Sequence, residues 1–532
     1  MKNNKYIFTL LAFCGIMLLN ACEENLEIKP AKELASNYFE TEDQMMRAVG
    51  GIYASLAEIY GPQLNDATQY PMWLLPGDDL TSDGSGNTFE TFSGLNGSNG
   101  RVEGMWKRYY QTVARANVVL EKINTPEVSA IFTTPGLRNA NEGEALFLRS
   151  WVFYNLWDKY RKAPVQDERI ELISDAILPP SEDFELLDNA IASLEKAAEL
   201  LPASWDQNNL GRITKDGAYG LLVKCYVLRA CYNGKNNEDY GKAIAAFNKI
   251  SESRQLVNFG ENFDYRYENN AESLFEYQAS HAPAQDNAWL PNSFGGDVGQ
   301  MGAFYHYYNT HWGNYSSGII GPTQKLVGAF EEGDPRIAET LTDNADNLNW
   351  KLWWVAPTWD KFNGYQMVKY IKGERGNLYD KTWKVSSGNN PRILRLGDVK
   401  LAVAEAYLAT GDAGNALKQV NDIRERARKS TPDGVESAVP AALGAVTMQD
   451  IMDERLVELA GEEGHRWTDL RRWHAAGYIN LASWSATDFG FPSKYDASLF
   501  KFDVNKHLLY PIPVSELNSN PEMAASGNNP GY

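Results

Sequence analysis

Cysteine is scarce in this sequence, and its placement excludes a disulfide-stapled protein. There are 4 cysteines among 532 residues. Cys14 and Cys22 lie near the N-terminus. Cys225 and Cys231 lie in one helical pattern, at a spacing that turns them to different faces of a helix, so they cannot pair with each other. We expect both to be buried and inert, because a chain of this length can fold on its hydrophobic core alone.

Positive charge is also in deficit. The chain has 50 lysines and arginines against 69 aspartates and glutamates, which gives a formal net charge of −19 at pH 7. Nucleic-acid binding selects for basic patches, so we expect no nucleic-acid partner. The same balance argues against adhesion to anionic lipid through charge, and a membrane attachment would have to come from apolar groups.

The motifs of common enzyme classes are missing. There is no Walker loop, no HExxH, no CxxC and no Gly-x-Ser-x-Gly elbow. His306 and His311 stand among aromatic residues, and we interpret them as polar loop contacts rather than metal ligands. Asp78 and Asp79 are adjacent, so their side chains diverge and form no acid–base pair, and their spacing is not that of an EF-hand. We therefore expect no catalytic residue, no metal and no cofactor.

The N-terminus carries an export signal. An apolar run from Ile7 to Leu19 follows a basic start, and it is too short to span a bilayer as a stable helix. A small residue then precedes Cys22, which resembles a bacterial lipoprotein signal, in which the cysteine is acylated and becomes the mature N-terminus. This predicts a signal peptide at 1–21, acylation of Cys22 and a lipidated tether at 22–40. The alternative is an ordinary cleaved signal with an incidental cysteine.

Two acidic residues, Glu23 and Glu24, follow the cysteine. They resemble the tag that sends some lipoproteins to the outer cell surface. Each methylene buried in lipid contributes about 0.8 kcal/mol, so several acyl chains hold a protein firmly. We expect a lipid-anchored protein of the outer membrane that is exposed at the cell surface.

Helical periodicity dominates two parts of the chain, about 41–260 and 395–475. Within them, small and large residues alternate at the spacing of tetratricopeptide repeats, where small residues let the two helices of a hairpin approach and large ones fill the groove between repeats. The intervals are irregular, which indicates a repeat array with insertions. The matching positions are Ala190, Leu194, Ala197 and Pro202, then Tyr240, Ala243, Phe247 and Ile250, then Val403, Ala404, Tyr407, Gly411, Ala416, Val420 and Ile423.

Two other regions, about 61–104 and 260–395, are irregular and rich in Gly, Asn, Asp and aromatic residues. Irregular segments of this length in a compact protein are usually functional. We therefore predict a mainly α-helical protein, in which a tetratricopeptide-like repeat scaffold carries long loops that form a ligand-binding region. A single domain would cover 41–532.

The densest charged run extends from Glu454 to Trp473. Its pattern predicts a helix, a break at glycines and a second helix, with arginines and carboxylates that pair across the break. Arg466 is expected to be paired and partly buried. A catalytic role for Glu463 and His465 is disfavoured.

This run resembles the signature of the SusD/RagB family of starch-utilisation-type nutrient-binding lipoproteins, with its Arg-x-x-Glu-Leu, Glu-Gly-His-Arg and Asp-Leu-Arg-Arg-Trp elements. Further stretches agree in the same order along nearly the whole mature chain. One departure is Arg161-Lys162-Ala163 before Pro164, where a Gly-containing turn is usual. The other matching stretches begin at Trp106, Glu144, Gly211, Leu509 and Asn529.

The resemblance implies a surface protein that binds an oligosaccharide and passes it to a SusC-type TonB-dependent outer-membrane transporter, without catalysis. Related proteins also serve peptides or glycoproteins. Two alternatives remain from the residues themselves: a glycan-cleaving enzyme on a helical scaffold, and a helical-repeat protein that binds peptides in a concave groove.

Candidate ligand contacts are argued from residue chemistry in the irregular regions. An aromatic ring covers the C–H face of a pyranose, and neighbouring carboxylates and amides bond its hydroxyls. The segment 304–315 is the densest aromatic cluster and is interleaved with polar residues. The predicted contacts are Trp73, Asp78, Asp79, Asn87, Trp289, Tyr305, Tyr307, Asn309, Trp312, Asn314, Tyr315 and Trp354.

Overall fold

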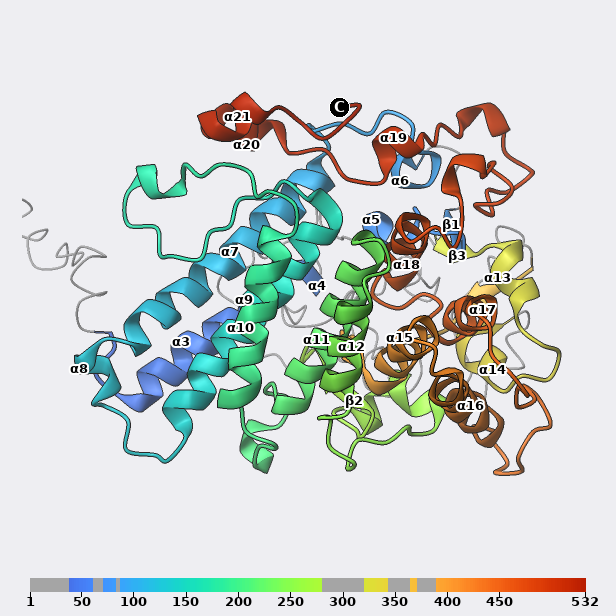
Figure 1. The fold of residues 1–532 in the computed structure, drawn as a ribbon, viewed down its shortest axis with the longest axis horizontal. Coiled ribbons are helices and arrows are strands. Elements are labelled where there is room, and N and C mark those ends of the chain that lie inside the picture. The colour runs from blue at the N-terminus through green and yellow to red at the C-terminus, as the bar shows by residue number, and fades with distance from the viewer. Residues whose placement is uncertain (1–37, 61–69, 83–86, 280–319, 343–363, 371–388) are drawn as a thin grey trace, which may run out of the picture.

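The computed structural model describes residues 38–60, 70–82, 87–279, 320–342, 364–370 and 389–532 (Figure 1). Helices make up most of this part of the chain, as predicted. The N-terminal half contains α3 (Glu42–Ser55), α4 (Ala57–Tyr60), α5 (Tyr70–Leu74), α6 (Thr88–Thr91), α7 (Gly100–Ile123), α8 (Pro126–Ser129), α9 (Leu137–Tyr160), α10 (Glu185–Leu200), α11 (Lys215–Tyr232) and α12 (Asn237–Phe247).

Shorter helices predominate after residue 320. The C-terminal part contains α13 (Gln324–Ala329), α14 (Arg336–Thr340), α15 (Leu396–Ala409), α16 (Ala413–Lys429), α17 (Met448–Glu458), α18 (His465–Ala475), α19 (Val504–His507), α20 (Val514–Ser519) and α21 (Pro521–Ser526). Single turns of 3-10 helix include η1 (Ile173–Ala176), η2 (Gln207–Asn209), η3 (Phe259–Phe263), η4 (Tyr265–Tyr267), η8 (Leu481–Ser483) and η9 (Ala497–Leu499).

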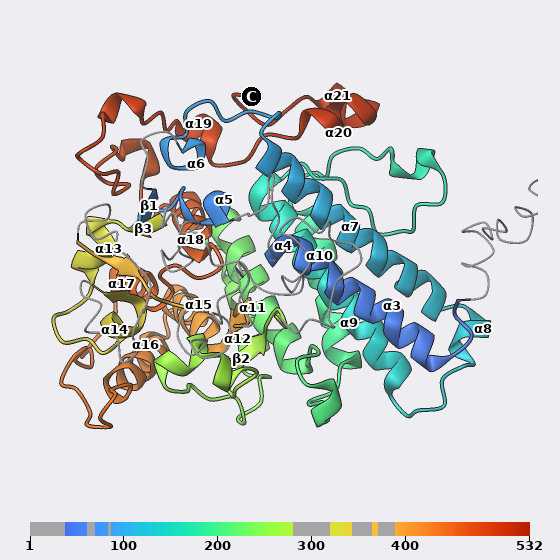
Figure 2. The ribbon, with the colours of Figure 1, turned by 180° about the vertical axis from the view of Figure 1, so that it is seen from behind.

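The long helices stack in chain order, as expected for a repeat scaffold. α9 packs on α10, α10 on α11, α11 on α12, α12 on α15 and α15 on α16 (Figures 1 and 2). The predicted hairpin around Gly411 joins α15 to α16. Gly411 has a φ of +88°, which favours glycine, and the side chain of Asp412 accepts from the N–H of Asn415 to cap α16. The tetratricopeptide-like scaffold is confirmed.

The main hydrophobic core is continuous across both halves. Its buried residues extend from Met45 in α3 to Met523 in α21. Cys225 and Cys231 are buried and unpaired, as predicted. A search of the described residues for a helix long and apolar enough to cross a membrane finds none.

Three small antiparallel sheets join distant parts of the chain. β1 (Leu80–Ser82) pairs with β3 (Ile320–Pro322), β2 (Ser273–Phe275) with β6 (Leu394–Arg395), and β4 (Leu341–Thr342) with β5 (Gln366–Met367). Each of these strands lies in or beside one of the two regions that were predicted to be irregular, so the sheets connect those regions to each other and to the helical body.

The region 61–104 is less irregular than its composition suggests. It contains α5, β1, α6 and the start of α7, and the four residues from Met72 to Leu75 are all at most 5 % exposed. Its described residues form short elements, several of which are buried. The Gly and Asp residues here bend the chain between short elements, while the apolar residues between them reach the core.

Candidate functional site

Most of the predicted ligand-binding residues lie in chain segments that are bordered on both sides by described residues of the fold. We call the described residues that border these segments the loop stems. They are Tyr60, Tyr70, Ser82, Asn87, Ala279, Ile320, Thr342, Gly364, Tyr370 and Asn389. Their mutual contacts decide which segments are presented together.

The first pair of stems is held by β1 and β3. Ser82 is the register partner of Ile320, and Leu80 is that of Pro322. Thr323 adds two bonds beyond the strands: its N–H donates to the carbonyl of Asp79 at 2.9 Å, and its hydroxyl donates to the carbonyl of Asp78 at 2.8 Å. Ile320, the described residue that follows segment 280–319, is therefore held close to the Asp78–Asp79 turn.

A second group of stems surrounds Tyr60. Its ring stacks on that of Tyr277, with centroids 5.5 Å apart and planes 17° apart. The N–H of Ala279 donates to the side-chain oxygen of Asn390 at 2.7 Å. Segments 61–69, 280–319 and 371–388 thus all have a border in one neighbourhood.

The remaining stems close on themselves. The side-chain amide of Asn389 donates to the carbonyl of Tyr370 at 2.9 Å, so both borders of segment 371–388 meet. Leu341 is the register partner of Met367, so the strands on either side of segment 343–363 are also paired with each other. β5 also contacts β3. The described residues of the two irregular regions therefore converge in space.

The charged run from Glu454 to Trp473 is a helix, a turn and a helix, as predicted. α17 ends at Glu458 and α18 begins at His465. Arg455 bridges the break, because its Nε donates to Asp469 at 2.7 Å. Gly464 has a φ of +71°, and a Cβ there would lie 2.7 Å from the Cβ of Trp73. Only glycine fits this position without displacing the tryptophan.

The residues between the two helices and the first residues of α18 contact the loop stems or residues close to them. We call residues 461–466 the anchor turn. Glu462 accepts from Lys369, the neighbour of Tyr370, at 2.8 Å. The Nε of Arg466 donates to Asp78 at 2.5 Å.

Two further contacts of the anchor turn reach the same stems. The backbone N–H of Gly461 bonds to Asp79, and Glu463 shares a hydrogen bond with Tyr60. Together with the bonds of Glu462 and Arg466, these contacts place one short turn against three stem groups that are far apart in the sequence.

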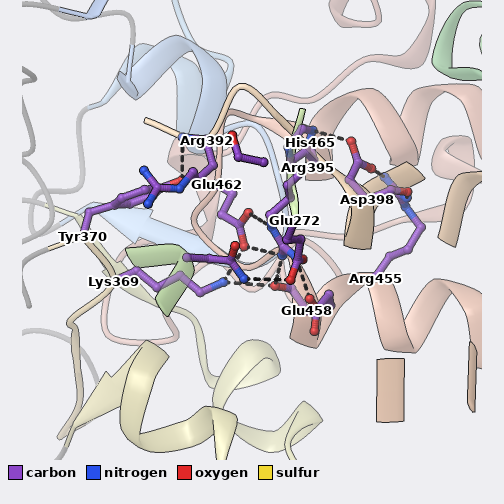
Figure 3. Close-up of polar contacts among 12 residues, drawn as sticks. Glu272, Lys369, Tyr370, Arg392, Arg395, Asp398, Arg455, Glu458, Glu462 and His465 are labelled. Carbon is purple, nitrogen blue, oxygen red and sulfur yellow. Dashed lines mark hydrogen bonds and ion pairs between the residues drawn. The ribbon is translucent and has the colours of Figure 1, made fainter. Parts of the chain in front are cut away.

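A buried ionic cluster supports the anchor turn from below (Figure 3). Arg395 is fully buried and contacts Glu272, Glu458 and Glu462 at 2.7 to 2.8 Å. Burial opposes ionisation, but Arg426, Arg395 and Arg336 hold the pKa of Glu458 far below its ordinary value. Such a cluster is stable only while every member keeps its partners.

His465 does not fit an acid–base role. Its Nδ1 lies 3.1 Å from the ammonium of Lys224, which in turn lies 2.5 Å from Asp398. Burial, and then the charge of Lys224, lowers the pKa of His465 from 6.5 to about 4. The imidazole is neutral at physiological pH, and its Nδ1 accepts a hydrogen bond from the Lys224 ammonium.

Two carboxyl groups, Asp79 beside the anchor turn and Glu463 within it, have pKa values above their ordinary range. Burial, and then the adjacent Asp78, raises the pKa of Asp79 from 3.8 to about 7. Burial raises the pKa of Glu463 from 4.5 to about 8, and Glu462 adds to the effect. These groups hold protons near neutral pH because the cations around them are already paired.

A small cavity lies beside the anchor turn and is lined by Trp73, Lys224, Glu463 and His465 among others. Its volume is about 60 Å³. Ligand pockets usually measure roughly 300–1,000 Å³, so this cavity has room for a few water molecules and not for a sugar ring. Among the described residues, no group of three or more His, Cys, Asp or Glu side chains is arranged to hold a metal ion.

Three of the predicted ligand contacts are buried in this structure. Trp73 is 5 % exposed, Asp78 0 % and Asp79 2 %. Trp73 packs against Tyr60, and Asp78 is paired with Arg466. These side chains hold the loop stems, and their contact with a ligand stays a prediction.

Of the other predicted ligand contacts, Asn87 lies among the described residues and the rest do not. Asn87 is half-buried and caps α6, because its side-chain oxygen accepts from the N–H of Phe89 at 3.0 Å. The acylation site and most of the aromatic candidates lie outside the described residues. These are Cys22, Trp289, Tyr305, Tyr307, Asn309, Trp312, Asn314, Tyr315 and Trp354.

Several residues of the site carry no motif in the sequence. Glu272, Lys369 and Arg395 are each at most 1 % exposed, and Lys369 and Arg395 stand between apolar neighbours in the sequence. The available signal is that a charge between apolar neighbours, such as Arg395 between Leu394 and Leu396, must find a partner when buried. Nothing in the sequence identifies that partner.

Comparisons with known proteins agree with this architecture. A model described as "SusD family" matches residues 262–532, and one described as "Starch-binding associating with outer membrane" matches residues 26–227. A SusD-like protein of Bacteroides ovatus is 24 % identical over 487 residues, which are 86 % of this chain and 80 % of that protein.

Solved structures with the same fold are equally distant in sequence. A SusD homolog from Bacteroides thetaiotaomicron has a TM-score of 0.72 at 17 % identity and covers 94 % of this chain and 98 % of its own. A laminarin-binding SusD-like protein has a TM-score of 0.69 at 22 % identity, with coverage of 93 % and 100 %. These likenesses establish the fold.

Proposed function

The chain belongs to the SusD family, and on that premise we propose that it is a lipid-anchored surface protein that binds a glycan and delivers it to a SusC-type TonB-dependent transporter. The observation that carries the proposal is the convergence of the loop stems on the anchor turn. It joins the borders of the segments in which the aromatic candidates lie, and binding proteins commonly present loops from a rigid scaffold.

The ligand is proposed to be an oligosaccharide. Several rings in an arc can stack on successive sugars, and amide side chains between them can bond the hydroxyls. Similarity to a laminarin-binding protein and to a family model described as starch-binding supports a glucan as the first class to test. The proposed contacts are Asn87, Trp289, Tyr305, Tyr307, Asn309, Trp312, Asn314, Tyr315 and Trp354.

Binding without catalysis is favoured by the state of three carboxylates in and near the anchor turn. Glycoside hydrolysis needs two carboxyl groups on either side of the sugar, roughly 5–10 Å apart. Asp78, Glu458 and Glu462 are buried and engaged in ion pairs. None of them is available to a sugar, which supports a binding protein over a hydrolase.

The membrane attachment is proposed to come from acylation of Cys22, with residues 22–40 as the lipidated tether. The acidic pair at Glu23 and Glu24 supports exposure at the outer surface. The family model described as associating with the outer membrane supports the compartment.

One experiment tests binding and catalysis together. The purified protein is titrated calorimetrically with laminarin and with starch oligosaccharides, and the same mixtures are then assayed for new reducing ends. The proposal predicts binding of at least one glycan class with no increase in reducing ends. Turnover of a bound glycan would favour the hydrolase, and binding of peptides with no glycan binding would favour the helical-repeat alternative.

A further inference from the structure

An unusual apolar surface lies on the connection between α9 and α10, residues 161–184, which we call the α9–α10 loop. Four large aliphatic side chains within one short stretch are exposed. Ile170 is 42 % exposed, Leu172 67 %, Ile173 88 % and Ile177 36 %. Single exposed apolar residues are ordinary. Four of them within eight residues indicate a surface that contacts another molecule when the protein functions.

The base of this loop is firmly held, so the exposure is a property of the fold. The side-chain amide of Asn117 donates to the carbonyls of Gln166 and Glu168 at 2.9 and 2.8 Å. Arg149 donates to the carbonyl of Asp167 at 2.8 Å.

The tip itself is also ordered by local bonds. The carboxylate of Asp175 accepts from the N–H of Glu171 at 3.0 Å and from that of Leu172 at 2.8 Å, which fixes the turn at η1. On the far side, Asn520 donates to the carbonyl of Leu178 at 2.9 Å. The aliphatic side chains are therefore presented outward on a rigid projection.

The loop lies at the end of the molecule where the membrane tether would leave. Arg169 contacts Glu121 near the end of α7, and α8 follows directly. Glu42, at the start of α3, contacts Thr134 in the connection after α8. Figures 1 and 2 agree that the loop and α8 lie at the same end of the long axis. The tether of about 16 residues from Cys22 to Tyr38 spans at most roughly 55 Å.

The chemistry of the tip fits a lipid surface better than a protein partner. At these exposed fractions, the four aliphatic side chains have an exposed surface area on the order of 400 Å². This is about half of the roughly 800 Å² that each partner buries in a stable protein complex. The four residues include no Trp, Tyr or Arg, the residues that dominate protein interfaces. A small aliphatic projection suffices for insertion among acyl chains, since each buried methylene contributes independently.

We propose that the α9–α10 loop inserts Leu172 and Ile173 into the membrane surface, as a second contact that orients the lipid-anchored protein. The proposal rests on the proposed acyl anchor at Cys22. The tether raises the local concentration of the loop at the bilayer, so a contact too weak to hold a free protein still sets the orientation of a tethered one. Charge gives no attraction to the bilayer, because Arg169 lies 3.3 Å from Glu171 and the remaining charges around the tip, Asp167, Glu168 and Asp175, are acidic, so the contact depends on the aliphatic side chains alone.

The test places a probe on the loop in the full lipidated chain. An Ile173→Cys variant is labelled with a polarity-sensitive thiol dye and reconstituted in phosphatidylcholine vesicles with and without nitroxide-labelled lipid. Cys225 and Cys231 are buried, and burial raises the pKa of both thiols, so neither competes for the dye.

A matched control uses Val435→Cys. Val435 is 67 % exposed, and the connection between α16 and α17 that carries it lies at the opposite end of the molecule (Figures 1 and 2). A third variant adds Leu172→Asp to Ile173→Cys. Both substitutions are at exposed positions and leave the core intact, which thermal melting verifies.

The proposal predicts a blue shift and about twofold quenching by nitroxide lipid for the dye at position 173, none at position 435, and loss of quenching with Leu172→Asp.

An unquenched dye at 173 on vesicles that carry the protein overturns the loop contact alone. Equal quenching at both positions overturns its specificity. Quenching that requires a co-reconstituted transporter assigns the tip to a protein partner instead. Failure of the chain to float with vesicles overturns the anchor and the loop contact together, and none of these outcomes bears on glycan binding.

Discussion

Replacing Arg466 with alanine should destabilise the fold and loosen the anchoring of the loop stems. The guanidinium is bonded to Asp78 through Nε at 2.5 Å and through a terminal nitrogen at 2.9 Å, and Asp78 is fully buried. Breaking a buried pair from one side costs about 3–5 kcal/mol, because a charge is left without its partner. Lys325 remains 2.6 Å from Asp78 and is partly exposed, so we expect the lower end, about 3 kcal/mol.

The assay is urea denaturation followed by tryptophan fluorescence, with the midpoint compared between variants. Arg47→Ala is the control, since Arg47 forms an exposed pair with Asp43 whose loss costs about 0.5 kcal/mol or less. Adding Asp78→Asn to Arg466→Ala should recover part of the loss, because the stranded carboxylate is then neutral. An unchanged midpoint for Arg466→Ala, together with lost ligand binding, would contradict the structural role and make Arg466 a ligand contact.

The same pair gives a dependence on pH with a definite sign. Although burial opposes it, the charge of Arg466 lowers the pKa of Asp78 from 3.8 to about 2. A carboxyl whose pKa is depressed in the folded state stabilises the protein above the unfolded value of 3.8 and loses that contribution as the pH falls toward 2. The Arg466→Ala variant should lose less stability than the native protein over this window.

Three further predictions concern separate parts of the molecule. Gly464→Ala should lower the melting temperature, because its Cβ would lie 2.7 Å from the Cβ of Trp73 at a positive φ, whereas Gly50→Ala, which has nothing within 4 Å, should not. Asp79→Asn should flatten the fall in stability between pH 4 and pH 7, since a carboxyl whose pKa is raised from 3.8 to about 7 destabilises the fold progressively as the pH rises through that range; an unaltered pH profile would contradict this. Cys22→Ala should remove the protein from the membrane fraction of cells that lack the transporter, and its retention there would refute the acyl anchor.

Patterns within one element were predictable from the sequence. The hairpin at Gly411 follows from small and large residues at helical spacing, and the helix-turn-helix of residues 454–473 follows from its charges and glycines. The burial of Cys225 follows from the same kind of local pattern. The dense charge around Arg466 predicted that it would be paired, but its partner Asp78 lies 388 residues earlier in the chain and could not be identified from that pattern.

Contacts between distant segments were not predictable. The Gly- and Asp-rich surroundings of Asp78 indicate an open loop, yet β1 pairs with β3 and Thr323 bonds to Asp78 and Asp79. Nothing near Asp78 indicates these partners, because they follow more than two hundred residues later. Lys369 and Arg395 were missed for the same reason: each is a lone charge whose meaning depends on Glu462.

The most direct test of glycan binding by the aromatic segments compares two tryptophans. Trp312→Ala and Trp73→Ala are each titrated calorimetrically with the glycan that the native protein binds, alongside thermal melting. If Trp312 is a stacking platform, its loss weakens binding by about five- to a hundredfold, roughly 1–3 kcal/mol, with an unchanged melting temperature. Trp73, which is 5 % exposed, should instead lower the melting temperature. Unaltered affinity in Trp312→Ala with a lowered melting temperature would contradict the account and place that ring in the core.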